Sequence, residues 1–129
     1  MVPTPEQEQI IQEEKLAVLA TLRSDGSPQL SPINYAYQDG RFLISTTRDR
    51  AKCRNVRRNP QVSLCILRQA GRPYVTVFGQ AQIEETDIVE RTAAIFRSMS
   101  DRPLPDNFGE LLAQQRRVLI VVTPERFVP

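Results

Sequence analysis

The stretch that decides the fold is residues 16–47, which reads LAVLATLRSDGSPQLSPINYAYQDGRFLISTT. It contains three strand-like runs separated by two Asp-Gly pairs, Asp25-Gly26 and Asp39-Gly40. An Asp-Gly pair between such runs is a strong hairpin signal, because both residues tolerate the positive φ angles of a tight turn. The stretch therefore predicts an antiparallel meander with strands over 16–22, 29–37 and 42–46. Pro32 favours an edge, bulge or bend in the middle strand, since proline has no N–H to donate.

The rest of the chain adds three more strands and a few helices to this meander. Apolar and β-branched runs predict strands over 62–67, 74–83 and 118–122, the last one ended by Pro124. Helices are expected over 5–14, capped by Thr4, over about 86–99, capped by Thr86, and over 108–115. A short basic helix is expected between residues 48 and 58. Together these elements predict a mainly β (α+β) fold: a six-stranded antiparallel barrel or sandwich with peripheral helices.

Composition narrows the chemistry that this chain can perform. Its 129 residues are enough for one small domain, and they include two cysteines and no histidine. The missing histidine excludes Ser–His and Cys–His catalysis and histidine-based metal sites, so we expect no metal. Any chemistry is therefore expected to come from a bound cofactor. Cys53 and Cys65 lack C-x-x-C spacing, which favours unpaired structural thiols in a reducing cytoplasm.

Charge and hydropathy argue against two classes of partner. The net charge of +2 gives no overall basic field of the kind that binds nucleic acid. No apolar run approaches the ~20 residues of a membrane span. Residues 1–15 lack the basic and apolar regions of a secretory signal. We therefore expect a cytoplasmic protein that binds neither nucleic acid nor membrane.

The basic helix is the clearest candidate for a binding site. Six of the eleven residues from 48 to 58 are Arg or Lys, and they directly follow the hydroxyls of Ser45, Thr46 and Thr47. Unpaired N–H groups at a helix start, with hydroxyls and guanidinium groups beside them, make a phosphate site. Basic residues on a short helix are also typical of a solvated face. The segment alone leaves both interpretations open.

An ordered set of motifs resembles a known superfamily, the pyridoxamine-phosphate-oxidase-like split β-barrel proteins that bind flavins and deazaflavins. The similarity is greatest to its deazaflavin (coenzyme F420)-dependent reductase branch. The similarity extends from about residue 15 to the end of the chain. No single motif is specific to the superfamily, but the order and spacing of the whole set are specific. The motifs are Leu19-Ala20-Thr21-Leu22, Asp25-Gly26-x-Pro28, Ser31-Pro32-Ile33, Asp39-Gly40, Ile44-Ser45-Thr46-Thr47, Lys52-x-x-Asn55, Asn59-Pro60 with the following QVSL, and Tyr74-Val75-Thr76-Val77-x-Gly79-x-Ala81.

The resemblance implies a six-stranded split β-barrel over residues 1–129, a homodimer, and a cofactor site whose members can be placed by position. One segment would lie against the tricyclic ring, and a second would contact the ribityl chain and phosphate. A basic pair would bind the phosphate, with Arg48 and Asn55 as weaker candidates. Residues of the fifth strand would approach from the second subunit. In that order, the implied residues are Ser31, Pro32, Ile33 and Asn34; Ile44, Ser45, Thr46 and Thr47; Arg50 and Lys52; and Tyr74, Val75 and Gln80.

The resemblance also implies an activity. A reductase of this branch transfers a hydride from reduced F420 to a conjugated small-molecule acceptor such as a bilin or quinone. Arg54, Arg57 and Arg58 would attract the acidic oligoglutamate tail of F420. An FMN-binding oxidoreductase and a non-catalytic flavin or deazaflavin carrier stay open as alternatives, and no catalytic residue can be identified. The absence of histidine argues against pyridoxamine phosphate oxidation, because the oxidases carry a C-terminal substrate segment with histidine and arginine.

Overall fold

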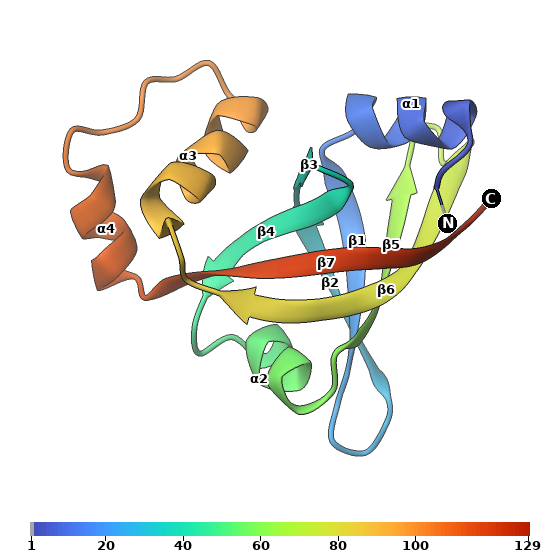
Figure 1. The fold of residues 1–129 in the computed structure, drawn as a ribbon, viewed down its shortest axis with the longest axis horizontal. Helices are drawn as coiled ribbons and strands as arrows, with labels where there is room; N and C mark the ends of the chain where they lie inside the picture. The colour runs from blue at the N-terminus through green and yellow to red at the C-terminus, as the bar shows by residue number, and fades with distance from the viewer. Residues whose placement is uncertain (1) are drawn as a thin grey trace.

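The computed structural model describes residues 2–129, which form one antiparallel sheet with four helices around it (Figure 1). In chain order the elements are α1 (Pro5–Glu13), β1 (Leu16–Leu22), β2 (Pro28–Asn34), β3 (Ala36–Gln38), β4 (Arg41–Thr47), α2 (Ala51–Arg58), β5 (Gln61–Leu67), β6 (Tyr74–Glu84), α3 (Ile88–Met99), α4 (Phe108–Gln114) and β7 (Arg117–Val128).

The strands are arranged in the order β2-β1-β5-β6-β7-β4-β3, and the sheet curls into a split β-barrel. Both Asp-Gly hairpins are confirmed. Asp39 and Gly40 have φ angles of 53° and 75°, the paired positive values that a tight two-residue turn requires. The edge position expected from Pro32 is also confirmed, because β2 is the first strand of the sheet and pairs with β1 alone.

The structure has seven strands rather than six, because the run expected over residues 29–37 is divided at Tyr35. Up to Asn34 this run pairs with β1, and from Ala36 it pairs with β4. At the switch, the backbone N–H of Tyr35 donates to the carbonyl of Lys15 at 3.0 Å, while its phenol donates to the carbonyl of Ile11 at 2.8 Å. Tyr35 is 2 % exposed. The two edges of the sheet are therefore consecutive in the chain, which brings them around toward one another.

The last strand is longer than expected, and Pro124 does not end it. Strand β7 continues to Val128 alongside β6, with a bulge in the pairing between Phe78 and Gly79. Gly79 lies opposite Pro124, and a Cβ atom on Gly79 would be 2.4 Å from the backbone oxygen of Thr123. The bulge and the missing side chain leave room for a proline within a strand. Together β6 and β7 form the long central pair in Figure 1.

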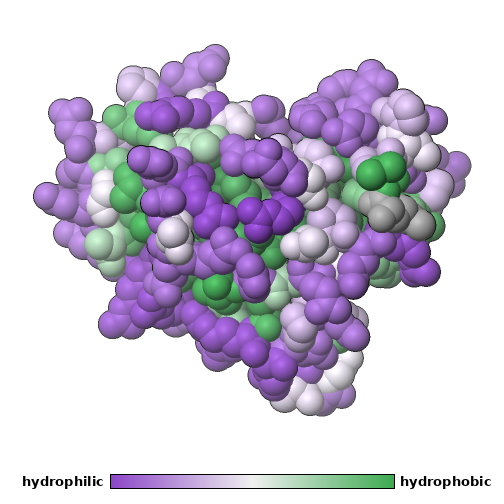
Figure 2. Space-filling model, in the orientation of Figure 1, coloured by the Kyte–Doolittle hydropathy of each residue, from purple (hydrophilic) through white to green (hydrophobic). Residues whose placement is uncertain are grey.

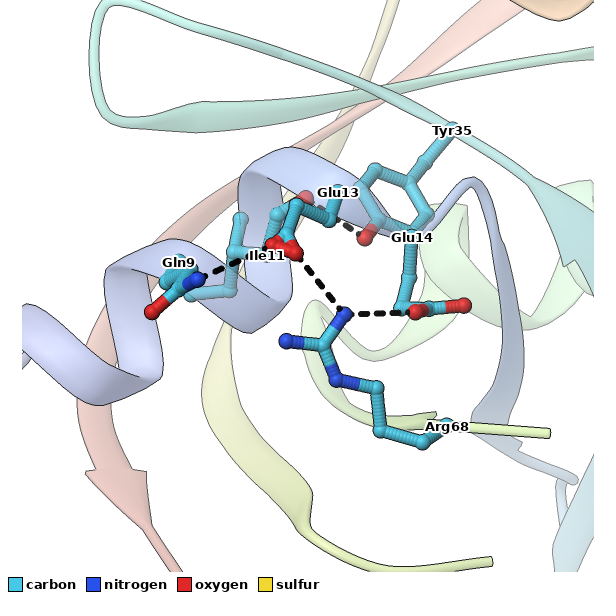
Figure 3. A network of polar contacts seen from close by, with 6 residues as sticks. All are labelled: Gln9, Ile11, Glu13, Glu14, Tyr35 and Arg68. Atoms are coloured by element: carbon cyan, nitrogen blue, oxygen red, sulfur yellow. Dashed lines mark hydrogen bonds and ion pairs between the residues drawn. The ribbon is translucent and has the colours of Figure 1, made fainter. Parts of the chain in front are cut away.

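Helix α1 covers one end of the barrel, and its expected cap at Thr4 is confirmed. The backbone N–H of Gln7 donates to the hydroxyl of Thr4, and the backbone N–H of Thr4 donates to the side-chain oxygen of Gln7, which makes a complete capping box. Ile10 and Ile11 are buried among the apolar side chains of the barrel interior. Figure 3 shows how the helix end is tied to the sheet, with Arg68 donating to Glu13 at 3.3 Å and to Glu14 at 2.9 Å.

Helices α3 and α4 cover the opposite end of the sheet (Figure 1). Ile95 of α3 packs on the outer face of β4 and β7, in a second apolar cluster with Leu43, Leu119 and Val121. The expected cap of α3 at Thr86 is wrong. The N-cap is Asp87, which has a φ angle of 51° and makes no capping hydrogen bond with its side chain, and the helix begins at Ile88. Over the face of the molecule seen in Figure 2, hydrophilic residues predominate and hydrophobic ones show between them.

One buried hydroxyl within α3 has no hydrogen-bond partner among the described residues, that of Thr92, which is fully buried. An unpaired buried hydroxyl costs about 1–3 kcal/mol. We expect Thr92→Val to raise the free energy of unfolding by about 1 kcal/mol in urea titrations. Thr21→Val is the matched control, because the Thr21 hydroxyl accepts from Asn55 at 3.0 Å and its loss should destabilise. Equal effects of the two substitutions would contradict the prediction.

Two negative observations complete the description. In residues 2–129, no helix is both long and apolar enough to cross a membrane. Over the same residues, no group of three or more acidic or cysteine side chains is placed to hold a metal ion.

Candidate functional site

A cleft of about 410 Å³ lies where the curled sheet fails to close. Strand β2 pairs only with β1, and residues 45–47 of β4 pair only with β7, so no strand pairing joins these two segments. We call this gap the seam. Two helices and one strand end meet it: the start of α2, one face of α3, and the start of β7. The cleft is lined by Pro32, Ile33, Asn34, Ser45, Thr46, Thr47, Arg50, Lys52, Ile95, Phe96, Met99 and Arg117.

One end of the cleft is cationic. The hydroxyl-bearing end of β4 leads directly into α2, and the chain turns there because the N–H of Arg50 donates to the carbonyl of Thr47 at 3.2 Å. Arg50 and Lys52 reach the cleft from this turn, and Arg117 reaches it from the start of β7. Among residues 2–129, no carboxylate forms an ion pair with any of the three. The site therefore concentrates positive charge without a protein anion to balance it.

The electrostatics of this end follow from that arrangement. Burial, together with the nearby charge of Arg50, lowers the pKa of Lys52 below its usual value. The same two causes lower the pKa of the Arg117 guanidinium. In both residues the charged form is disfavoured relative to water, so an anion bound among them would restore the pKa of each. The three cations could together bind a phosphate or a similar anion.

The other end of the cleft is apolar. Its apolar lining comes from Pro32 and Ile33 of β2 and from Phe96 and Met99 of α3. Asn34 is the one uncharged polar side chain that β2 adds to the lining. Apolar walls of this kind suit a flat conjugated ring, with a few polar groups to fix its orientation. The cleft thus joins a surface for a ring to a site for an anion.

Eight of the thirteen residues predicted for the site line this cleft: Pro32, Ile33, Asn34, Ser45, Thr46, Thr47, Arg50 and Lys52. Ser31 and Ile44 lie on the same two strands but are not part of the lining. The side chain of Ile44 is fully buried in the barrel interior. A role for Ile44 in binding would therefore rest on its backbone.

The three predicted residues of β6 lie away from the cleft. Tyr74 is 42 % exposed, and Gln80 lines a separate groove with Leu22 and Phe78. The side chain of Val75 is fully buried in the barrel interior, so it is not available to a partner. Within this chain, none of the three lines the cleft that holds the basic residues.

The remaining basic residues of the 48–58 segment make local contacts. Arg48 forms an ion pair with Glu85, and Arg54 donates to the carbonyl of Asp49 at 2.6 Å. Arg57 donates to the carbonyl of Arg48, and Arg58 to that of Leu22.

Asn55, a weaker phosphate candidate, is instead 5 % exposed and satisfied within the protein. It donates to Thr21 and Gln29 and accepts from Arg58 at 2.8 Å. These contacts give Asn55 a structural role in joining α2 to the first hairpin. The two cysteines are free, as expected, and burial raises the pKa of the Cys53 thiol, which favours its unreactive form.

Sequence analysis missed four lining residues: Ile95, Phe96, Met99 and Arg117. The first three lie on α3, which is far from the motifs in sequence and is brought over the seam only by packing on β4 and β7. Arg117 carries one usable signal, since it begins the strand that pairs with the end of β4, opposite Thr47.

Known proteins resemble this chain both in sequence and in fold. Residues 3–128 match the family described as pyridoxamine 5'-phosphate oxidase. The chain belongs to this family. The resemblance expected from the sequence is therefore confirmed, and so is the split β-barrel fold.

Solved structures of similar fold illustrate the range of the family. An F420 reductase is 26 % identical with a TM-score of 0.78, and the match covers 98 % of both chains. A conserved hypothetical protein from Mycobacterium tuberculosis is 24 % identical over 98 % of this chain and 83 % of its own, with a TM-score of 0.80. The heme storage protein HutZ from Vibrio cholerae is 23 % identical over 99 % and 94 %, with a TM-score of 0.69. The last two similarities establish the fold alone.

Proposed function

We propose that this protein is an F420-dependent oxidoreductase that transfers a hydride from the reduced deazaflavin to a conjugated acceptor. The observation that carries the proposal is the cleft at the seam. It places Arg50, Lys52 and Arg117, which have no ion-pair partner in the described chain, in one cleft with the apolar side chains of β2 and α3. The 26 % identity to an F420 reductase over nearly the full length of both chains supports the choice of cofactor.

The residues present fit such a cofactor. Its phosphate would be held by the three cations and by the hydroxyls of Ser45, Thr46 and Thr47, since charge-assisted bonds to phosphate are the strong ones. Its ring would lie against Pro32 and Ile33, where the outer edge of β2 leaves backbone groups unpaired by any strand. When bound, the reduced deazaflavin supplies the hydride.

The protein's own contribution would be position and water exclusion rather than covalent chemistry. Phe96 and Met99 close the apolar end of the cleft and would shield the reacting face from water. No carboxyl group is present among the described residues that line the cleft. The proton that completes reduction of the acceptor would therefore come from solvent, and no side chain is assigned as a general acid.

Titration of the purified protein with F420 and with FMN tests the choice of cofactor. We expect F420 to bind more tightly, as followed by its absorbance and fluorescence, and reduced F420 to be oxidised when a bilin or quinone is added. Tighter binding of FMN would indicate the FMN-dependent alternative. Binding of F420 without turnover of any acceptor would indicate a carrier.

A salt series extends the same titration to the acidic tail of F420. Arg54 and Arg57 are exposed on α2, the helix whose start lines the cleft, so they are accessible to that tail. Screening lengths fall from about 10 Å at 0.1 M salt to about 3 Å at 1 M. The preference for F420 over a form lacking its glutamates should therefore shrink at high salt. An identical salt response of the two forms would show that this helix does not hold the tail.

We also propose that the protein is a homodimer in which β6 completes the neighbouring site. Tyr74 is exposed, Gln80 lines an open groove, and Leu30 on the edge strand is 66 % exposed, so apolar surface is available to a partner. Light scattering at micromolar concentration should give twice the mass of the chain. A monomer that still binds the cofactor would contradict the proposal.

A further inference from the structure

Arg117 contacts both the hydroxyl-bearing end of β4 and an aromatic ring of α3. As the first residue of β7, it pairs with Thr47 across the ladder. Its Nη1 donates to the hydroxyl of Ser45 at 3.4 Å, and its Nε donates to Gln115 at 2.8 Å. On the other side, its guanidinium carbon lies 6.0 Å from the centre of the Phe96 ring.

Phe96 in turn belongs to the packing of the helices. Its ring meets that of Phe108 in α4 edge-on, with centroids 5.5 Å apart and an interplanar angle of 70°. Its neighbours in α3, Ile95 and Met99, also line the cleft. A displacement of the Phe96 ring would therefore change the packing of α3 against α4 and the position of the apolar side chains that line the cleft.

Besides its bond to Gln115, Arg117 makes two weak contacts toward the cleft. At 6.0 Å the guanidinium is at the outer limit of a cation–π contact, and at 3.4 Å its bond to Ser45 is long. Arg50, which carries the same charge, lies close enough to disfavour the charged guanidinium. A phosphate between the three cations would offer Arg117 short charge-assisted bonds. These are stronger than its present contacts with Ser45 and with the Phe96 ring.

We propose that Arg117 is a third anion-binding residue of the cleft, and that a bound anion draws its guanidinium off the ring of Phe96 and so repositions helix α3. The cationic end of the cleft then controls the wall at the apolar end. Part of the proposal, the anion site, is shared with the proposed function, but it requires only an anion and no particular cofactor.

The test uses inorganic phosphate as the probe and fluorine NMR as the readout. The chain has five phenylalanines, all of which can be replaced by 4-fluorophenylalanine. The Phe96 signal is assigned from its loss in Phe96→Leu. Phosphate is added at constant ionic strength, with sodium chloride as the balancing salt, to separate binding from screening. Phosphate affinity is read independently from the rise in melting temperature.

We expect the Phe96 signal to shift saturably at millimolar phosphate. Arg117→Met should weaken phosphate binding about tenfold, the loss of one charge-assisted bond, and should abolish the shift. Arg117→Lys should keep most of the affinity but lose the shift, because lysine lacks the planar group that stacks on a ring.

Arg126 and Phe78 provide a matched control, since they form the same kind of pair at 4.7 Å away from the cleft. Arg126→Met should leave both phosphate affinity and the Phe96 shift unchanged. The proposal is overturned if phosphate does not bind saturably, if it binds equally well to Arg117→Met, or if the Phe96 signal still moves in that variant. Because the probe is phosphate, a protein that passes this test and yet does not bind F420 would refute the proposed function alone.

Discussion

Replacing both Arg50 and Lys52 by alanine is expected to weaken F420 binding by about 100-fold or more. Each substitution removes a charge-assisted bond to the phosphate, worth about 1.5–3 kcal/mol, or about tenfold or more in affinity. Both side chains line the cationic end of the cleft and have no ion-pair partner in residues 2–129. The free energy of unfolding should change little, because the substitutions also remove two neighbouring like charges. Fluorescence titration and thermal unfolding measure the two quantities.

The matched control removes two positive charges elsewhere. Arg23 lies in the first hairpin loop and Arg126 lies near the end of β7, and neither lines the cleft. Arg23→Ala with Arg126→Ala lowers the net charge from +2 to 0, the same change as in the test variant. Affinity should then fall by less than about threefold, as for exposed charges that make no direct contact. Equal losses in the two variants would mean that only overall charge matters and that the phosphate binds elsewhere.

The second large effect is on stability, at Gly79. An added Cβ would lie 2.4 Å from the carbonyl oxygen of Thr123 and 3.1 Å from the Cα of Pro124, and both are backbone atoms that no rotamer change can move. We expect Gly79→Ala to open the bulge between β6 and β7 and to cost about 3 kcal/mol, at the upper end of ordinary overpacking. For a domain of this size, the melting temperature should fall by about 10 °C.

Gly109→Ala is the control for this substitution. Its Cβ would meet only the Cγ2 of Val89, at 3.5 Å, which is ordinary contact, and the residue lies within helix α4. Alanine is favoured over glycine there by about 0.5–1 kcal/mol. The melting temperature of Gly109→Ala should be unchanged or higher. A Gly79→Ala variant as stable as this control would show that the bulge yields easily.

Most of the fold could be predicted from local chemistry, because it depends on turns and caps that are specified by neighbouring residues. Asp39-Gly40 determines its hairpin and Thr4 determines the start of α1, whatever the rest of the chain does. The division at Tyr35 could not be predicted in this way. It arises because the strand exchanges β1 for β4 as its partner, and β4 reaches that position only through the curl of the whole sheet.

The same distinction separates the site residues that were found from those that were missed. Residues 45–52 are contiguous, so their hydroxyls and charges could be recognised together. Phe96 joins them only because α3 packs over the outer face of β4. Arg117 joins them only because β7 pairs with β4, which places Arg117 opposite Thr47. Val75 was placed in the site by resemblance alone, and its side chain lies in the barrel interior of this chain.

The open seam leaves the outer edge of β2 unpaired, which bears on the tendency of the protein to aggregate. A strand whose outer edge is unpaired is a template for other chains, and it invites domain swapping and amyloid-like growth. Here the seam must stay open if a ligand is to lie in it. Pro28 and Pro32 both lie on β2, and each removes one N–H from that strand. The edge is thereby made a poor template for a foreign strand, yet it keeps a flat apolar surface for a ring. Aggregation resistance and ligand access therefore depend on the same residue, Pro32.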